Sequence, residues 1–323
     1  MEKTEALKSR FDTFLHQCDF SGKPTELYAP IDYTVRQKGK RLRPMLCLLG
    51  CDLFGGSIDN ALWPALALEV FHNFTLIHDD IMDQAPLRRG METVYQKWSP
   101  NVAILSGDAM LAMAFLLVMR TPNAVAAANL LGKVAREVCE GQQLDLNFET
   151  SSQVTIDAYL EMIRLKTAVL LATSLQMGAL VANADTVNTM ALYKFGIAAG
   201  MAFQLQDDLL DCYGDVQVFG KVTGGDIAEN KKTYLFLKAL ELASDEDKER
   251  LEYLFTGHLK MDLSEKITEV KRIYDKLQVR EAVESRMEEY YHEAEASLDA
   301  VRVPEERKVA LKHYVTQLSG RVR

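Results

Sequence analysis

Two short acidic segments carry the chemistry that this sequence could do. They span residues 79–83 and 207–211, and both read Asp-Asp-x-x-Asp after an apolar stretch. Carboxylates in apolar surroundings are costly unless a cation or hydrogen bonds compensate them. Mg²⁺ prefers oxygen ligands and usually binds through a few carboxylates plus the phosphates of a substrate. A single segment fits a solvated helix end equally well, but the repeated pattern favours a magnesium–diphosphate clamp.

Basic clusters strengthen the diphosphate interpretation. Each acidic segment is followed by a basic loop that contains glycine, at residues 86–90 and at residues 220–233. A further cluster at residues 39–44 ends in Pro44, which places it near the start of a helix. By itself this cluster could be an ordinary basic loop. Helix N-termini and arginine side chains both bind phosphate, so the three clusters together predict anionic substrates.

A charge count for such a site comes out near zero. The six carboxylates and an organic diphosphate are negative, and about three Mg²⁺ ions would offset most of that charge in a partly buried site. The remaining positive charge would come from four side chains, which are Arg88, Lys166, Lys221 and Lys231.

Composition excludes several classes of protein. The chain has 323 residues, of which 48% are hydrophobic and 26% charged, and its net charge of −9 makes nucleic acid an unexpected partner. Its five cysteines form no C-x-x-C pair, which indicates reduced thiols in a cytoplasmic protein. The N-terminus is charged from Glu2 onward and does not resemble a signal peptide. The longest apolar stretch, residues 109–119, is about half a membrane span, so we expect a soluble protein without a membrane-spanning helix.

Proline usage predicts the fold. Seven of the eight prolines lie at or before Pro122, and the eighth is Pro304. The proline-free stretch between them is rich in Ala, Leu, Met, Glu and Lys, which suits long helices. No alternating β-branched run or Asn-Gly hairpin signal occurs. We therefore expect an all-α helical bundle, with residues 1–323 forming a single domain because no convincing linker interrupts the chain.

Helical periodicity places the acidic segments inside buried helices. In residues 68–83 the polar side chains form one stripe, and residues 196–212 show a similar stripe. A helix that is apolar nearly all round is buried, so a single polar stripe must face a cavity, a ligand or a partner. If the two helices face each other, they would line a slot inside the bundle. Beyond about residue 243 the densely charged sequence predicts an outer helical layer.

These residues together resemble the trans-isoprenyl diphosphate synthases, the polyprenyl synthetase family. The resemblance runs from about Tyr33 to Lys312, and its matching segments are GKRLRP at 39–44, HDDIMD at 78–83, PLRRG at 86–90, GQQLDL at 141–146, RLKTAVL at 164–170, FQLQDDLLD at 203–211, GKVTGGDI at 220–227 and NKKT at 230–233. It implies an all-α bundle around a deep central cavity, in an enzyme that is usually a homodimer. The implied reaction joins an allylic diphosphate (dimethylallyl, geranyl or farnesyl) to isopentenyl diphosphate, head to tail, and releases pyrophosphate.

The resemblance also implies roles for individual residues. The Mg²⁺ ligands would be Asp79, Asp80, Asp83, Asp207, Asp208 and Asp211, with Mn²⁺ as a substitute metal. Contacts to the allylic diphosphate would come from Arg88, Lys166, Lys221 and Lys231. The isopentenyl diphosphate site would consist of Lys40, Arg43, His72 and Arg89. Near the allylic cation would lie Lys166, Thr167 and Gln204.

The residues before the first acidic segment bear on product length. In the family this region forms the floor of the cavity, and here Phe74 is bulky while Thr75 is small. An aromatic side chain five residues before Asp79 predicts a short product, either C15 or C20, and the two remain open. Isoprenoid biosynthesis is the implied pathway.

Three other functions compete with this interpretation. A terpene cyclase on the same fold usually lacks a complete second Asp-Asp-x-x-Asp segment and a site for a second substrate. A non-catalytic subunit of a heteromeric synthase typically loses one acidic segment. A helical interaction protein would leave the paired segments unexplained. This chain has both segments complete, which favours the synthase.

Overall fold

The computed structural model describes residues 2–151, 153–214, 224–255 and 261–318. Apart from one two-stranded hairpin, the regular elements of these residues are all helices, so the all-α prediction is confirmed. The chain divides into two compact units. The divisions fall after Ala300 and inside the helices α7 (Ala124–Thr150), α9 (Val169–Val181), α10 (Thr186–Tyr213) and α17 (Glu305–Leu318). The prediction of one domain over residues 1–323 stays a prediction.

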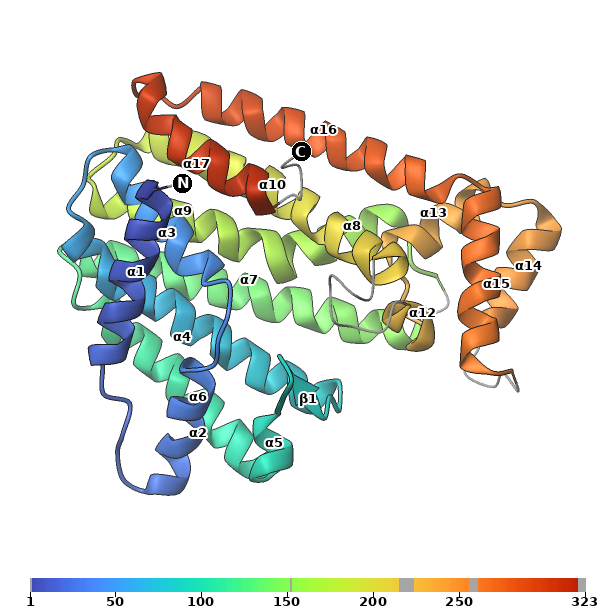
Figure 1. Cartoon of the computed structure of the whole chain (residues 1–323), viewed down its shortest axis with the longest axis horizontal. Helices are drawn as coiled ribbons and strands as arrows, with labels where there is room; N and C mark the ends of the chain where they lie inside the picture. The colour runs from blue at the N-terminus through green and yellow to red at the C-terminus, as the bar shows by residue number, and fades with distance from the viewer. Residues whose placement is uncertain (1, 152, 215–223, 256–260, 319–323) are drawn as a thin grey trace. The chain divides into compact units, whose positions relative to one another are not determined.

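The first unit comprises Met1–Lys133, Thr173–Tyr193 and Val301–Tyr314. Its elements are α1 (Glu2–Gln17), α2 (Thr25–Val35), α3 (Leu42–Leu53), α4 (Ile58–Met82), β1 (Leu87–Arg88), β2 (Met91–Glu92), α5 (Val94–Lys97), α6 (Pro100–Val118), and parts of α7 (Ala124–Thr150), α9 (Val169–Val181), α10 (Thr186–Tyr213) and α17 (Glu305–Leu318). In this unit α4 packs against α3 and α6 (Figure 1). Gly107 on α6 allows this approach, because a Cβ there would meet His78 Nε2 of α4 at 2.3 Å.

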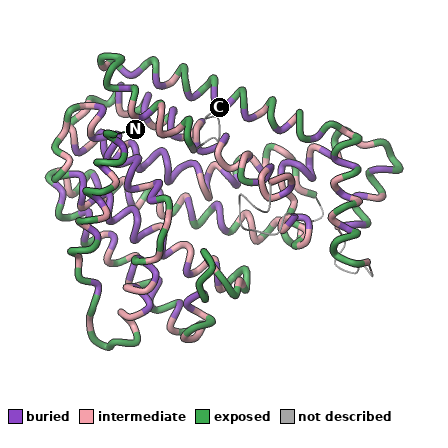
Figure 2. The backbone as a smooth tube through the Cα atoms, in the orientation of Figure 1, coloured by how far each residue is buried: buried purple, intermediate pink, exposed green. Residues whose placement is uncertain are grey.

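Helix α4 is the core of the first unit. It is buried on all sides between Ala61 and Phe74, and the purple colouring of Figure 2 follows it. A helix that is apolar nearly all round must be covered by neighbours, and α3 and α6 cover this one. The polar end of α4, from residue 78 to residue 82, is only partly buried.

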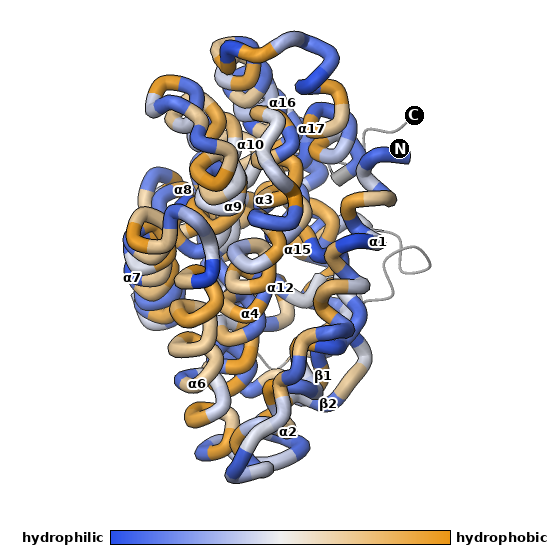
Figure 3. The backbone as a smooth tube through the Cα atoms, turned by 90° about the vertical axis from the view of Figure 1, so that its left-hand side faces the viewer, coloured by the Kyte–Doolittle hydropathy of each residue, from blue (hydrophilic) through white to orange (hydrophobic). Residues whose placement is uncertain are grey.

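Helix α6 is strongly apolar along most of its length (Figure 3). It is longer than the apolar stretch at residues 109–119, and by length and composition alone it could cross a membrane. Its buried side chains, such as Met110 and Val118, pack in the core of the first unit, as expected of a core helix. Its opposite face exposes Leu105 and Leu116.

The second unit comprises Val134–Ala172, Lys194–Ala300 and Val315–Arg323. Besides its parts of α7, α9, α10 and α17, it contains α8 (Ile156–Ile163), the π-helical turn η1 (Arg164–Ala168), α12 (Gly225–Ala228), α13 (Tyr234–Leu242), α14 (Asp245–Leu254), α15 (Leu263–Lys276) and α16 (Val279–Asp299). Its core gathers buried side chains from α8, α10, α13, α15 and α16. The charged C-terminal sequence is thus helical, as the sequence predicts.

Candidate active site

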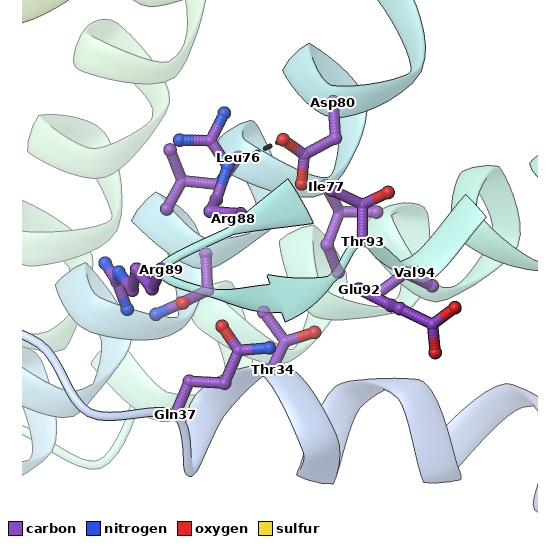
Figure 4. A pocket seen from close by; sticks show the side chains of 11 residues that line it. Thr34, Gln37, Leu76, Ile77, Asp80, Arg88, Arg89, Glu92, Thr93 and Val94 are labelled. Atoms are coloured by element: carbon purple, nitrogen blue, oxygen red, sulfur yellow. Dashed lines mark hydrogen bonds and ion pairs between the residues drawn. The ribbon is translucent and has the colours of Figure 1, made fainter. Parts of the chain in front are cut away.

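The first acidic segment lies at the C-terminal end of α4. Asp79 and Asp80 are in its last turn, and Asp83 caps the helix by donating its backbone N–H to Asp79 O at 2.8 Å. Asp80 is 4% exposed and accepts a hydrogen bond from Arg88 Nε at 2.6 Å (Figure 4). Burial raises the pKa of Asp80, while Arg88 opposes that shift. The structure therefore joins the first acidic segment to the basic loop that follows it.

That basic loop is the β1–β2 hairpin, which the sequence analysis did not predict. Leu87 pairs with Glu92 and Arg88 with Met91, so Arg89 and Gly90 form a two-residue turn. Both turn residues have positive φ, 54° and 76°, as a type I′ turn requires. Arginine adopts this conformation rarely, which explains why no turn signal is visible in the sequence.

Three of the four residues of the predicted isopentenyl diphosphate site, Arg43, His72 and Arg89, come together in the first unit. Burial lowers the pKa of His72 well below its usual range, and the positive charges of Arg43, Arg89 and Arg88 add to that shift. The imidazole is therefore neutral at pH 7 and lies among three arginines. A Cβ on Gly39 would meet Arg89 Nη1 at 3.0 Å, so this glycine lets the arginine approach the loop that carries Lys40. The helix start predicted for residues 39–44 is confirmed, since α3 begins at Leu42.

The second acidic segment lies near the C-terminal end of α10. Asp208 is 5% exposed and accepts hydrogen bonds from Gln204 Nε2, at 3.1 Å, and from the Tyr159 hydroxyl. Burial, together with the nearby carboxylates of Asp226 and Asp207, raises the pKa of Asp208 to about 8. A carboxyl group in this position needs added positive charge to be fully ionised at neutral pH.

Asp211 joins the second acidic segment to the chain after residue 223. Its Oδ2 accepts a hydrogen bond from the backbone N–H of Asp226 at 2.9 Å, and its carbonyl accepts one from Gly224 at 2.7 Å. Lys231 lies in the same region, with its Nζ 2.8 Å from Glu229 Oε2 and 3.8 Å from Asp226 Oδ1. Asp226 therefore belongs to this acidic group. The predicted substrate contact Lys221 lies outside the described residues.

Lys166 lies in the π-helical turn η1. Such turns are frequent at functional sites because the irregular backbone redirects side chains. Its Nζ forms an ion pair with Asp145 of α7. The close packing depends on Gly141, because a Cβ there would meet the backbone N of Lys166 at 2.4 Å.

Hydrogen bonds link the predicted cation-stabilising residues to the second acidic segment. Thr167 Oγ1 donates to Gln204 Oε1 at 2.8 Å, and Gln204 Nε2 donates to Asp208. Hydrogen bonds at both Oε1 and Nε2 thereby fix the orientation of the Gln204 amide. The structure thus brings Thr167 and Gln204 together, as their assignment to a common role predicts.

Two lysines outside the predicted site anchor the segment that carries Lys231. Lys232 Nζ donates to the carbonyl oxygens of Phe148, at 2.6 Å, and Ser151, which satisfies acceptors at the end of α7. Lys266 of α15 is 5% exposed, and its Nζ donates to Ile227 O and Asn230 Oδ1, each at 2.6 Å. Helix α15 therefore holds the chain on both sides of Glu229.

The residues fit a metal that is bound jointly with a substrate. Within the described ranges, no three acidic, histidine or cysteine side chains gather into a ready-made metal cage. Mg²⁺ commonly keeps several waters and uses one or two carboxylates plus substrate phosphates. Such binding fits a carboxyl group that, like Asp208, is buried among other carboxylates.

Phe74 lies one turn before His78 on α4. It is 8% exposed, and its ring centroid is 5.5 Å from that of Phe71 and 4.9 Å from that of His78. His78 in turn approaches Ile104 O of α6 at 3.2 Å. The smaller Thr75 turns its hydroxyl back to His72 O at 2.8 Å.

Sequence reasoning missed three residues of this site. Asp145 and Asp226 lie inside segments that the sequence singles out, GQQLDL and GKVTGGDI, so an acidic residue within a matched motif was the available signal. Tyr159 offered no such signal. It is 49 positions from Asp208 in the chain, and only the packing of α8 against the rest of the second unit shows its hydrogen bond.

Comparison with known proteins identifies the family of this chain. The polyprenyl synthetase family model matches residues 24–277. A short chain isoprenyl diphosphate synthase of Methanothermobacter thermautotrophicus is 37% identical over 293 residues, which cover 90% of this chain and 86% of the relative. A solved geranylgeranyl pyrophosphate synthase is 41% identical, with a TM-score of 0.94 over 98% of both chains. Another, from Corynebacterium glutamicum and complexed with isoprenyl diphosphate and magnesium, is 28% identical, with a TM-score of 0.85 over 98% of both chains. The chain therefore belongs to the polyprenyl synthetase family.

Proposed function

We propose that this protein condenses isopentenyl diphosphate with an allylic diphosphate to give a short-chain all-trans prenyl diphosphate, with geranylgeranyl diphosphate (C20) as the main product. The observation that carries the proposal is the group formed by His72, Arg43, Arg88 and Arg89 beside the first acidic segment. Such a group suits an organic diphosphate, because arginine forks match phosphate oxygens. The geranylgeranyl relatives support the C20 product.

The side chains of this chain would divide the work between two substrates. Lys40, Arg43, His72 and Arg89 bind isopentenyl diphosphate, and Arg88, Lys166, Lys221 and Lys231 bind the diphosphate of the allylic substrate. The three aspartates of each acidic segment hold Mg²⁺, at about three ions per site. When bound, this metal supplies positive charge that stabilises the departing diphosphate.

The reaction breaks the allylic carbon–oxygen bond, forms a carbon–carbon bond to the alkene of isopentenyl diphosphate, and releases a proton, for which the departing pyrophosphate is the acceptor. The Thr167 and Gln204 oxygens would stabilise the allylic cation, because they are dipoles that are too weakly basic to trap it. Apolar side chains must exclude water, since hydrolysis would otherwise compete.

Product analysis tests the proposal. The enzyme is incubated with isopentenyl diphosphate and each allylic primer in turn, and the dephosphorylated products are separated by chromatography. A main C20 alcohol is expected. A C15 product would correct the chain length alone, whereas a cyclic product formed without isopentenyl diphosphate would overturn the synthase assignment in favour of a terpene cyclase.

We predict that Phe74→Ala lengthens the main product by at least one C5 unit. Phe74 is five residues before Asp79, which at about 1.5 Å rise per residue places its ring one to two turns below the acidic segment. A growing chain that runs along α4 would meet this ring. Chromatography of the variant's products measures the change.

Phe71→Leu is the matched control for this prediction. Phe71 is fully buried and its ring packs against Phe74, so both variants should lose stability, by up to about 3–5 kcal/mol for Phe74→Ala. Only Phe74→Ala should change the product. An unchanged product from folded Phe74→Ala would show that other residues set the chain length.

We also propose a soluble, cytoplasmic homodimer that associates through α6. Leu105 is 60% exposed and Leu116 is 69% exposed, and both lie on the same apolar face of that helix. Leu105→Glu and Leu116→Glu should each convert a dimer into a monomer, as measured by light scattering after size-exclusion chromatography. Val309→Glu, at an equally exposed apolar position on α17, should leave the dimer intact. A monomeric wild-type protein would refute the proposal.

A further inference from the structure

A buried ion pair adjoins the cationic group of the first unit. Arg41 Nη1 donates to Glu69 Oε1 at 2.6 Å, and the two residues are 7% and 2% exposed. Desolvating two charges is costly, so a buried pair is a poor way to gain stability alone. Neither residue belongs to the substrate contacts assigned above.

The arginine ties three elements together at one point. Arg41 precedes α3 in a left-handed conformation, with φ 51° and ψ 37°, which an arginine keeps only when its surroundings hold it there. Its Nη2 donates to Val35 O at 3.1 Å and to Gln37 O at 2.9 Å, at the end of α2. Its Nη1 reaches Glu69 on α4. The guanidinium therefore fixes both ends of the loop between α2 and α3.

That loop carries the predicted contacts to isopentenyl diphosphate. Lys40 immediately precedes Arg41, and Arg43 follows it in the first turn of α3. The directions of both side chains depend on the backbone conformation of Arg41. If Arg41 leaves this conformation, both cations move together.

The carboxylate is also coupled to the hairpin arginine. Desolvation lowers the pKa of Arg89, and the negative charge of Glu69 opposes that shift. Asn73, one turn after Glu69, donates to Glu69 O at 2.7 Å. Asn73 also lines a pocket with Gln37 and Arg89, of which the last two are labelled in Figure 4. Gly39 brings the loop against the Arg89 guanidinium. Glu69 thus interacts with both parts of the cationic group. It pairs with Arg41, which lies between Lys40 and Arg43, and its charge acts on Arg89.

We propose that Glu69 is the positioning residue of the isopentenyl diphosphate site, where it holds the loop of Lys40 and Arg43 through Arg41. The inference rests on the proposed function. It assigns Glu69 no contact with substrate or metal. Substitution of Glu69 should therefore change the KM for isopentenyl diphosphate and leave the KM for the allylic diphosphate unchanged.

Glu69→Gln tests this role, because it keeps the shape of the side chain and removes its charge. The KM for isopentenyl diphosphate should rise about 10-fold or more, the loss expected for one charge-assisted hydrogen bond, while the KM for the allylic substrate stays unchanged. Calorimetric titration with isopentenyl diphosphate should show the same weakening without turnover. Glu69→Asp retains the carboxylate and should recover part of the affinity.

Asn188→Ala is the matched control for a structural effect. Asn188 is also buried, and its side chain bonds to Asp185 and to the backbone N–H of Arg302, outside the candidate site. This variant should lower the unfolding temperature without changing either KM. If Glu69→Gln does not fold, Arg41→Lys replaces it, since lysine keeps the charge but cannot bridge Glu69, Val35 and Gln37 as a fork.

The outcomes distinguish failure of the proposed function from failure of the positioning role of Glu69. If wild-type protein neither binds nor consumes isopentenyl diphosphate, the proposed function fails. If wild type is active and a folded Glu69→Gln variant shows equal changes in both KM values, or none, the positioning role is wrong while the function stands.

Discussion

Asp79→Ala and Asp207→Ala should each lower kcat by about 100- to 1,000-fold, because each removes a carboxylate that holds positive charge at the departing diphosphate. The two positions open the two acidic segments, and each segment lies in a different compact unit. A comparable loss from both variants would therefore show that both segments take part in the same reaction. Steady-state kinetics over a range of MgCl₂ concentrations measures the loss.

The control for these variants is Asp157→Ala. Asp157 is an exposed acidic residue in the first turn of α8, and its removal should leave kcat unchanged. Thermal unfolding gives a second readout: Mg²⁺ with inorganic pyrophosphate should raise the unfolding temperature of wild type more than that of either variant. Full activity after exhaustive chelation would refute the metal requirement.

Arg43→Gln should raise the KM for isopentenyl diphosphate by about 10- to 150-fold, which corresponds to the loss of one hydrogen bond from a charged donor. The positive charges of Arg43, Arg89 and Arg88 all lower the pKa of His72, so these side chains lie close enough to act on one group. The KM for the allylic substrate should change far less. Initial rates with one substrate varied at a time separate the two effects.

Arg88→Gln is the complementary variant. Arg88 is adjacent to Arg89 in the hairpin but forms its ion pair with Asp80 of the acidic segment. The substitution should mainly raise the KM for the allylic substrate. Equal effects of Arg43→Gln and Arg88→Gln on both KM values would contradict the assignment of separate sites.

The helices were largely predictable from the sequence because their signals are local. The absence of proline between residues 122 and 304 and the polar stripes around Asp79 and Asp207 report on the helix that contains them. The two acidic segments lie within α4 and α10, as those stripes predict, with Asp83 as the capping residue of α4.

The hairpin was not predictable in the same way. Its strands have two residues each, and its turn places Arg89 rather than Asn or Asp at a positive φ. Backbone propensity opposes this choice, so contacts elsewhere must hold it. Tyr33, whose hydroxyl donates to Glu92 O at 2.9 Å, and Thr93, which donates to Ala85 O at 2.9 Å, supply them.

The hydrogen-bond and ion-pair partners of the site residues could not be predicted from the sequence, for a similar reason. The repeated spacing identifies Asp208, but its hydrogen bond from Tyr159 comes from another helix. Likewise, GKRLRP identifies Lys40 and Arg43, whereas the pairing of Arg41 with Glu69 joins residues 28 positions apart. Motifs report which groups are present, and packing determines which of them touch.

The two-residue turn of the hairpin has a consequence for enzyme engineering. Arg88 ends a strand and Arg89 begins the turn, so one peptide bond separates the arginine that pairs with Asp80 from the one that adjoins Gly39. In a strand, a shift of one residue sends each side chain to the opposite face. Inserting one residue before Arg88 would move that arginine into the turn position and away from Asp80. If the proposed substrate contacts are correct, we expect the length of this hairpin to affect substrate selectivity without any change in side-chain identity.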